Sequence, residues 1–307
     1  MTKRLYYCDH HEIPLPPEHR FPARKYRLLR DLLSLTTPPG AFTFCEAPEA
    51  ETAWIAAVHD PSYVDAFVGG RLDAAAVRRI GFPWSPGLVR RTLASVGGTV
   101  AATAEAVSSG WGGALAGGTH HAFPAYGSGF CVFNDFAVAI GWLRRMGGAA
   151  ARRVAIVDLD VHQGDGTAAF FENDASVLTL SLHGANNFPF RKQRSKIDVT
   201  FEDGAGDAEY LAALGPALER VREFGPDLVF YQSGVDGLAE DQLGRLGLTA
   251  GGLAQRDRMV FETIRQLSVP AVITLGGGYA SPIERTVEAH AQTFRLAREA
   301  LGGSLPR

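Results

Sequence analysis

Cysteine is scarce in this sequence. The 307 residues include only Cys8, Cys45 and Cys131, and their wide spacing and odd number predict neither a disulfide framework nor a thiolate zinc site. The sequence also lacks an apolar run of about 18 residues, the lower bound for a membrane-spanning helix, and its first 20 residues lack the apolar core of a signal peptide. These absences predict a cytoplasmic protein without a membrane partner.

A strong net charge is absent as well. The formal net charge is −3 and the pI is about 6.3, so the chain lacks the general basic field that attracts nucleic acid, and we expect no direct nucleic-acid partner. Hydrophobic residues make up 46% of the chain, which is enough for a large core. Because no linker, repeat or low-complexity segment interrupts the sequence, we expect one domain over residues 1–307.

Short apolar segments alternate with longer segments of helical spacing. We expect strands at 4–8, 42–46, 154–157, 176–182, 227–232 and 271–275, with extended chain at 111–118. We expect helices at 24–35, 62–68, 85–108, 134–146, 208–224, 249–267 and 283–301. Since the strands are almost wholly apolar, the pattern predicts an α/β fold with a parallel sheet covered on both faces.

The stretch 154–167, VAIVDLDVHQGDGT, combines a buried strand with metal-ligand chemistry. Asp158, Asp160 and His162 occupy alternate positions, which point to the same side in extended chain. We therefore expect them to converge at the carboxyl end of the strand. The glycines that flank Asp165 predict a sharp turn directly afterwards. Carboxylate and imidazole groups are suitable ligands for a divalent transition metal.

Other expected strands also end in reactive side chains, namely His120-His121, Asp236 and Tyr279. Strand ends meet at one edge of a parallel sheet, so these residues are expected to share a cleft. Asp160, His162 and Asp236 would supply three ligands and leave one position open, as at a catalytic zinc site. A histidine offers a general base and a tyrosine hydroxyl an oxyanion donor. Together these residues predict metal-assisted attack of water on a carbonyl group.

At these residues the chain closely resembles the histone deacetylase family of zinc-dependent amidohydrolases. The matching motifs keep the family's order and spacing along nearly the whole chain: GTHHA at 118–122, SGFCVFND at 128–135, VDLDVHQGDGT at 157–167, SLH at 181–183, SGVD at 233–236 and LGGGY at 275–279. Gln163, where many members carry a second histidine, and DQLGRLGLT at 241–249 most resemble the class IV branch and its bacterial relatives. The resemblance implies an arginase/deacetylase-like fold, with one open, mostly parallel eight-stranded sheet in a three-layer αβα arrangement.

The resemblance also implies the ligands of two ions. It assigns zinc, or iron(II) in the cell, to three side chains: Asp160, His162 and Asp236. It assigns a structural potassium ion to a neighbouring set that includes backbone carbonyls: Asp158, Asp160, His162, Ser181 and Leu182.

The same resemblance implies catalytic and substrate-binding residues. His121 is the expected base and is oriented by Asp165, while His120 is hydrogen-bonded to Asp158. Tyr279 is expected to polarise the amide oxygen. A tunnel for the acyl-lysine stem is implied at five positions: Gly129, Phe130, Phe188, Leu243 and Gly277.

We therefore predict zinc-dependent hydrolysis of N-acyl amides, above all of ε-N-acyl-lysine in a protein or peptide. The alternative is an acetylpolyamine amidohydrolase, for which Glu240 and Asp241 would supply acidic residues at the mouth while Arg191–Lys196 opposes a dication. A two-manganese ureohydrolase needs a further carboxylate where Gly237 and Leu238 follow the ligand position, so one metal is expected. A non-catalytic binding protein is disfavoured by the complete set of catalytic residues.

Overall fold

Eight parallel strands form one open sheet in the computed structural model, which describes residues 2–302. The strand order is β2-β1-β3-β8-β7-β4-β5-β6. In chain order the strands are β1 (Lys3–Tyr7), β2 (Phe42–Glu46), β3 (Trp111–Ala114), β4 (Val154–Asp158), β5 (Val177–Gly184), β6 (Ile197–Phe201), β7 (Leu228–Gln232) and β8 (Ala271–Thr274). The expected eight-stranded sheet is confirmed, and every strand pair is parallel rather than most of them.

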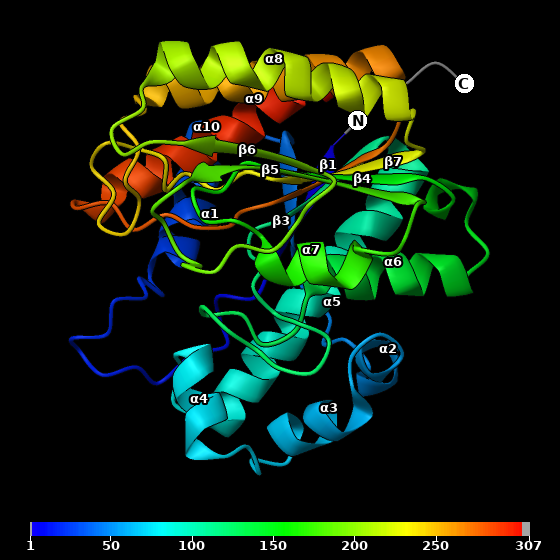
Figure 1. Cartoon of the computed structure of the whole chain (residues 1–307), viewed down its shortest axis with the longest axis vertical. Helices are drawn as coiled ribbons and strands as arrows, with labels where there is room; N and C mark the ends of the chain where they lie inside the picture. Colours follow the sequence, from blue (N-terminus) through cyan, green and yellow to red (C-terminus); the bar gives the residue numbers. More distant parts are fainter. Residues whose placement is uncertain (1, 303–307) are drawn as a thin grey trace.

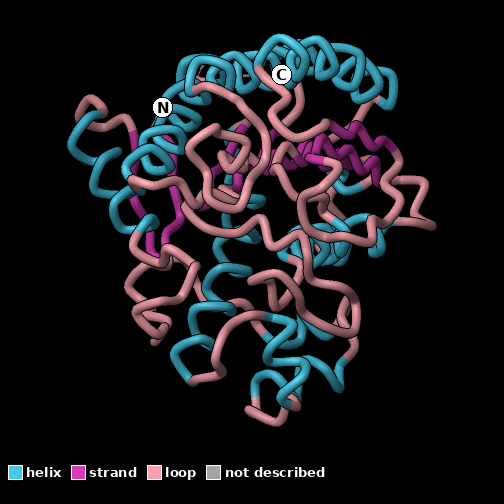
Figure 2. The backbone as a smooth tube through the Cα atoms, turned by 60° about the vertical axis from the view of Figure 1, so that its left-hand side comes forward, coloured by secondary structure: helices cyan, strands magenta, loops and turns pink. Residues whose placement is uncertain are grey.

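Helices cover both faces of this sheet and complete the expected three layers (Figures 1 and 2). One layer contains α1 (Lys25–Thr36), α8 (Asp207–Phe224), α9 (Ala250–Leu267) and α10 (Ile283–Leu301). The other contains α5 (Pro86–Ser109), α6 (Asp135–Arg145) and α7 (Asp165–Phe171), with the short helices α2 (Thr52–Ala56), α3 (Pro61–Val68) and α4 (Ala74–Ile80) beyond α5. A single 3₁₀ turn, Ala149–Ala151, precedes β4.

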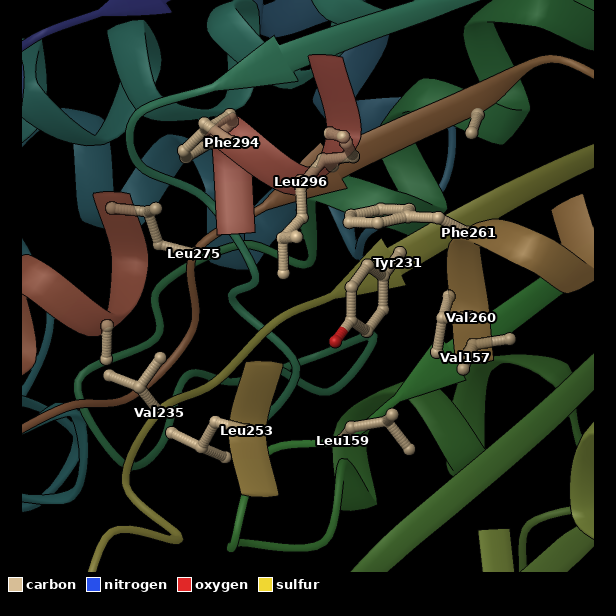
Figure 3. Close-up of a cluster of buried hydrophobic side chains, with 14 of the residues drawn as sticks. Val157, Leu159, Tyr231, Val235, Leu253, Val260, Phe261, Leu275, Phe294 and Leu296 are labelled. Atoms are coloured by element: carbon tan, nitrogen blue, oxygen red, sulfur yellow. The ribbon is translucent and has the colours of Figure 1, made fainter. Parts of the chain in front are cut away.

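The strand β4 shows why the apolar runs form a doubly covered sheet. Val154 and Ile156 belong to the core cluster shared with α5 and α6, whereas Ala155 and Val157 belong to the cluster shared with α8, α9 and α10. Figure 3 shows part of the second cluster, where Val157 lies with Phe261 of α9. Successive side chains of a strand point to opposite faces, so only a strand that is apolar at every position can fill both cores.

The prediction of extended chain from Asp158 to His162 is wrong. The strand β4 ends at Asp158, and the two following ligand candidates lie in the loop after it. The expected sharp turn is instead the start of α7, with Gly164 at the N-cap position. A Cβ atom on Gly164 would lie 2.4 Å from Oδ2 of Asp158, and one on Gly166 would lie 2.3 Å from the carbonyl oxygen of Ala122. Close packing, rather than a sharp turn, therefore requires these two glycines.

Sequence patterns missed α2, α4, α7 and β6. The strand β6 lies at the sheet edge with alternating exposed residues, so it carries no apolar run to reveal it. The helices α2, α4 and α7 span only five to seven residues each, too short for a clear helical period. Residues 1 and 303–307 of the expected single domain lie outside the described residues. None of the helices within residues 2–302 has the length and apolar character required to cross a membrane.

Candidate active site

The strands β4 and β7 lie side by side in the sheet, but the chain leaves them in opposite directions. It continues from β4 to β5 through α7, and from β7 to β8 through α9, and these two helices cover opposite faces. The loops after β4 and β7 therefore separate and leave a crevice at the carboxyl edge, where open α/β sheets bind their ligands. The candidate metal ligands lie in these two loops.

Asp160 and His162 from the first loop and Asp236 from the second converge as expected. Their ligand atoms all lie within 4.8 Å of one another, and all three residues are buried. Nδ1 of His162 is 3.0 Å from both Oδ1 of Asp160 and Oδ2 of Asp236. Burial and the adjacent Asp160 together raise the pKa of the Asp236 carboxyl to about 7. A divalent cation would relieve this repulsion, so the donor set and its burial fit a metal ion.

Backbone amides hold the two carboxylates in place. The Gly277 N–H donates to Oδ2 of Asp160 at 2.6 Å, and the Val161 N–H donates to Oδ1 of Asp236 at 2.9 Å. A Cβ atom on Gly277 would lie 1.8 Å from Oδ2 of Asp236, so only glycine fits there. The glycine turn before Tyr279 thus contacts both carboxylates directly.

Two buried histidine–aspartate pairs lie beside this cluster. Nδ1 of His120 is 2.7 Å from Oδ2 of Asp158, and Nδ1 of His121 is 2.7 Å from Oδ1 of Asp165. The structure thus brings together both pairs that the sequence resemblance implied. Each carboxylate fixes the orientation of its imidazole and leaves Nε2 free for other contacts.

The adjacent histidines differ in charge at neutral pH. Burial opposes protonation of His120, but Asp158 and Asp160 outweigh it and raise its pKa to about 9. Burial and the neighbouring His120 lower the pKa of His121 to about 4, although Asp165 opposes that change. His121 is consequently the neutral member, with a nitrogen that can accept a proton, while His120 is a cation.

Tyr279 lies half-buried at the end of the glycine turn, with its ring centroid 6.4 Å from that of Phe130. Burial raises the pKa of Tyr279 well above its ordinary value, and the carboxylates of Asp236 and Asp160 add to the shift. The hydroxyl therefore stays protonated at neutral pH and can donate a hydrogen bond. Gly276 and Gly278 have φ angles of +84° and +153°, which glycine adopts most readily.

Asp241 holds this tyrosine from the backbone side. Its carboxylate accepts N–H bonds from Tyr279 at 2.6 Å and from Leu243 and Gly244 at 2.8 Å each. The prediction that Asp241 could supply negative charge at the mouth of the site is wrong. These three N–H donors occupy its carboxylate, and Asp241 is only 8% exposed. An aspartate followed by glycine three residues later is a turn signal that would have indicated this role.

The expected tunnel is part of one cavity of about 620 Å³. Its lining includes both histidines, Asp160, His162, Tyr279 and all five expected tunnel residues: Gly129, Phe130, Phe188, Leu243 and Gly277. The ring of Phe188 meets the ring of His121 edge to face, with centroids 4.8 Å apart. Phe130 adopts a φ of +64°, an unfavourable conformation for phenylalanine that its N–H bond to the Ile80 carbonyl helps to hold.

Asp158, Asp165 and Asp236 do not line the cavity but lie behind the residues that do. Ser181 and Leu182, the remaining expected potassium ligands, are buried in β5. The sheet register pairs Ser181 with Asp158 across β5 and β4.

Two further polar residues support the site, and sequence reasoning underestimated both. Asp135 was expected only at the start of a helix, yet its carboxylate accepts N–H bonds from Gly118 at 2.9 Å and Thr119 at 2.8 Å, directly before the histidine pair. Gln163 is 1% exposed and donates to the Gln193 carbonyl at 2.8 Å. Gln163 therefore ties the loop of the candidate metal ligands to the basic segment 191–196.

The sheet is parallel throughout, and the candidate ligand cluster lies in the crevice between the loops after β4 and β7. These features define the class of this chain as an arginase/deacetylase-like αβα protein. A solved structure described as an HDAC homolog from Aquifex aeolicus superposes with a TM-score of 0.80 at 24% identity, covering 100% of this chain and 86% of that one. The crystal structure of the HDA15 HD domain superposes with a TM-score of 0.79 at 22% identity, covering 99% and 90%. These likenesses confirm the fold.

The sequence comparisons identify the family. The family profile described as "Histone deacetylase domain" matches residues 19–294, so the chain belongs to the histone deacetylase family. An uncharacterized protein of Picosynechococcus is 44% identical over 96% of this chain and 98% of its own length. Histone deacetylase 2 of Arabidopsis thaliana is 37% identical over 62% of this chain, and the match spans half of the plant protein. The protein is therefore a hydrolase with deacetylase-like amidohydrolase chemistry.

Proposed function

We propose that this protein is a zinc-dependent deacylase of ε-N-acyl-lysine in proteins or peptides. The observation that carries the proposal is the position of the Asp160–His162–Asp236 cluster against the same cavity as His121 and Tyr279. Hydrolysis of an unactivated amide needs an electrophile, a base and an oxyanion donor near one carbonyl group. This cavity holds a candidate for each.

Asp160, His162 and Asp236 are the proposed zinc ligands. Their two carboxylates and one imidazole would neutralise a dication and leave a coordination position free. When bound, zinc supplies a Lewis acid for the substrate carbonyl and for water. Asp160 and His162 line the cavity, while Asp236 lies behind them.

His121 is the proposed base, since it is neutral at neutral pH and its Nδ1 is held by Asp165. His120, held by Asp158, lines the same cavity beside it. Tyr279 donates its hydroxyl proton in a hydrogen bond to the developing oxyanion. His121 then returns its proton to the leaving amine, so the products are a carboxylate and a free amine.

The proposed lysine stem lies between Phe130 and Phe188, whose rings line the cavity. Three exposed arginines, Arg20, Arg79 and Arg245, also line it and therefore lie at its opening, and Arg245 is paired with Asp203 at 3.0 Å. Positive charge there disfavours a polyamine, which would need acidic residues. Since Asp241 faces backbone amides instead, the peptide substrate is favoured over the acetylpolyamine alternative.

Finer assignments belong to the same proposal. Gln163 and the segment 241–249 support the class IV branch, and three free cysteines suit a reducing cytoplasm. The paired positions of Asp158 and Ser181 support the potassium site. One sheet that includes all eight strands supports a single catalytic domain.

The decisive experiment measures metal content and hydrolysis together. We expect one zinc ion per chain, hydrolysis of acyl-lysine peptides and little hydrolysis of acetylpolyamines. Asp236→Ala should lose both metal and activity, because two remaining ligands form a much weaker site. Asp31→Ala, at an exposed position of α1, is the matched control and should retain both. Two ions per chain, or faster hydrolysis of acetylpolyamines, would contradict the proposal.

A further inference from the structure

Two exposed arginines at the opening of the cavity have no carboxylate partner within residues 2–302. Arg20, Arg79 and Arg245 are exposed and line the cavity, and Arg245 is paired with Asp203 at 3.0 Å. Arg20 and Arg79 form no such ion pair in the described part of the chain. The guanidinium of Arg79 lies over the ring of Tyr126, with Cζ 4.8 Å from the ring centroid, and this contact leaves its charge available to an anion.

Both unpaired arginines are anchored next to Phe130, one of the two aromatic residues proposed to hold the lysine stem. The Gly129 N–H, directly before Phe130, donates to the Arg79 carbonyl at 3.2 Å. The ring of His19, directly before Arg20, has its centroid 5.7 Å from that of Phe130. Backbone and ring contacts thus hold the segments of both arginines beside the proposed path of the substrate.

The other aromatic residue, Phe188, is followed closely by the basic segment 191–196, which contains four cations and no carboxylate. Phe190, directly before this segment, lines the cavity and is 87% exposed. Its ring meets that of Phe188 edge to face, with centroids 6.4 Å apart. Arg191 is exposed, and within residues 2–302 it forms no ion pair. The basic segment therefore begins at the opening of the cavity.

The opening is positive although the chain as a whole is not. The formal net charge of the chain is −3. Of the described residues that line the cavity, four are arginines, and Asp160 is the carboxylate among them. Asp160 is a proposed metal ligand, so a bound cation would offset its charge. A cleft lined by charge of one sign concentrates ligands of the opposite sign.

We propose that the opening binds carboxylate side chains that flank the acyl-lysine, so that the preferred substrate is an acidic segment of a protein; this rests on the proposed deacylase function. A lysine stem that enters the cavity leaves the flanking residues of its peptide at the opening, where Arg20, Arg79 and Arg191 lie. The guanidinium fork matches a carboxylate in shape and charge. Phe190 offers an apolar surface to the methylene groups of the same side chains. Flanking lysines would be repelled at these positions.

The test compares three peptides that share one acyl-lysine and differ in the two residues on each side of it, which are glutamates, alanines or lysines. The value of kcat/KM is measured with four zinc-loaded proteins: wild type, Arg79→Ala, the double variant Arg20→Ala/Arg79→Ala and the matched control Arg78→Ala. Arg78 is the exposed neighbour of Arg79 on α4 and does not line the cavity. Its loss changes the net charge of the protein as much as the loss of Arg79 does. Thermal unfolding shows whether each variant is folded, and Arg79→Gln replaces Arg79→Ala if the latter is not.

Wild type should prefer the glutamate peptide to the alanine peptide by about fourfold to twenty-fivefold, since two exposed ion pairs contribute about twofold to fivefold each. Arg79→Ala should lower this ratio by about twofold to fivefold, and the double variant should lower it further. Arg78→Ala should keep the wild-type ratio. The preference should also shrink as salt is added, because salt screens exposed charges.

The proposal is overturned if wild type hydrolyses the alanine or the lysine peptide as fast as the glutamate peptide. It is also overturned if Arg78→Ala lowers the ratio as much as Arg79→Ala, because the overall field of the protein, and not the opening, would then set the preference. Fluorescence anisotropy of labelled peptides gives Kd values without turnover. Wild-type protein that hydrolyses none of the peptides would contradict the deacylase function, while the order of the three Kd values would still decide the charge preference of the opening.

Discussion

Two neighbouring strands, β4 and β7, are as deeply buried as the loops that follow them. The strands and the loops differ in the interactions that stabilise them. The segments 154–157 and 228–231 are 0–1% exposed and contain only apolar or aromatic side chains, which pack into the two cores. The loops that follow place Asp160 and Asp236 at 1% and 0% exposure. Burial thus stabilises the strand bodies, whereas in the loops it costs free energy that hydrogen bonds and a cation must offset.

A single arginine connects the two kinds of region. Arg256 of α9 donates to the Leu159 carbonyl of the first loop at 3.2 Å and to the Gly234 carbonyl of the second loop at 2.6 Å. Its charge is balanced by Asp257, which also accepts a hydrogen bond from Tyr231 in β7. The loops are therefore anchored to the core layer, and changes in the two regions should have separable effects.

The largest expected effect comes from breaking a strand body. Phe230 of β7 is fully buried against Phe136 of α6, with ring centroids 5.3 Å apart. Phe230→Ala should lower the free energy of unfolding by about 3–5 kcal/mol, since it leaves a cavity in the core. Urea denaturation measures this loss. The metal content and kcat of the remaining folded protein should stay near wild type; a lost metal ion would show that the loops depend on this part of the core.

The next effect comes from a change confined to the site. Tyr279→Phe keeps the ring and removes only the hydroxyl donor, so kcat on the best acyl-lysine peptide should fall by about 10²–10³, or about 2.7–4 kcal/mol of transition-state stabilisation. KM should move little, because the hydrogen bond strengthens mainly as charge develops on the oxygen. Metal content and thermal stability should match wild type. A variant with nearly full turnover would remove Tyr279 from the mechanism.

The smallest effect concerns His59, a buried histidine that has no carboxylate partner among residues 2–302. His59 accepts the Asn134 N–H at 2.9 Å and contacts the Pro124 carbonyl at 3.2 Å, and burial lowers its pKa from 6.5 to about 4. As the pH falls below 6.5, the unfolded chain binds a proton before the folded chain does, so stability decreases towards pH 4. His59 should account for about 2 kcal/mol of the loss between pH 7 and pH 5.

The substitution His59→Gln tests this value, since glutamine supplies a donor and an acceptor but does not titrate. Urea denaturation of both proteins at pH 7 and pH 5 should show a shallower pH dependence in the variant. Equal dependence would mean that His59 takes up its proton at the same pH in the folded and the unfolded protein. His120, equally buried, shows the opposite pKa shift because two carboxylates, Asp158 and Asp160, lie beside it. His121 has one carboxylate, Asp165, and the neighbouring His120, and its pKa is lowered, so the balance of charges around a buried imidazole decides the direction.

Local patterns predicted much of the fold because the relevant signals lie within a few residues. The apolar run at 154–157 predicts a strand with both faces covered, and Asp60 before proline predicts the N-cap of α3 that the structure shows. The edge strand β6 lacks such a signal because exposed residues alternate with less exposed ones along it. Its position depends on β5, its neighbour in the sheet.

The sequence by itself determined the α/β class, the ligand types at the strand ends and the resemblance to the histone deacetylase family. Only the tertiary structure decided how the ligands meet, since Asp160 and His162 converge with Asp236 from loops rather than from an extended strand. It also decided that Asp241 holds backbone amides and that Arg91 lines the cavity. The physical reason is that a buried polar side chain is defined by its partners. Those partners come from segments far apart in the chain, which no local pattern contains.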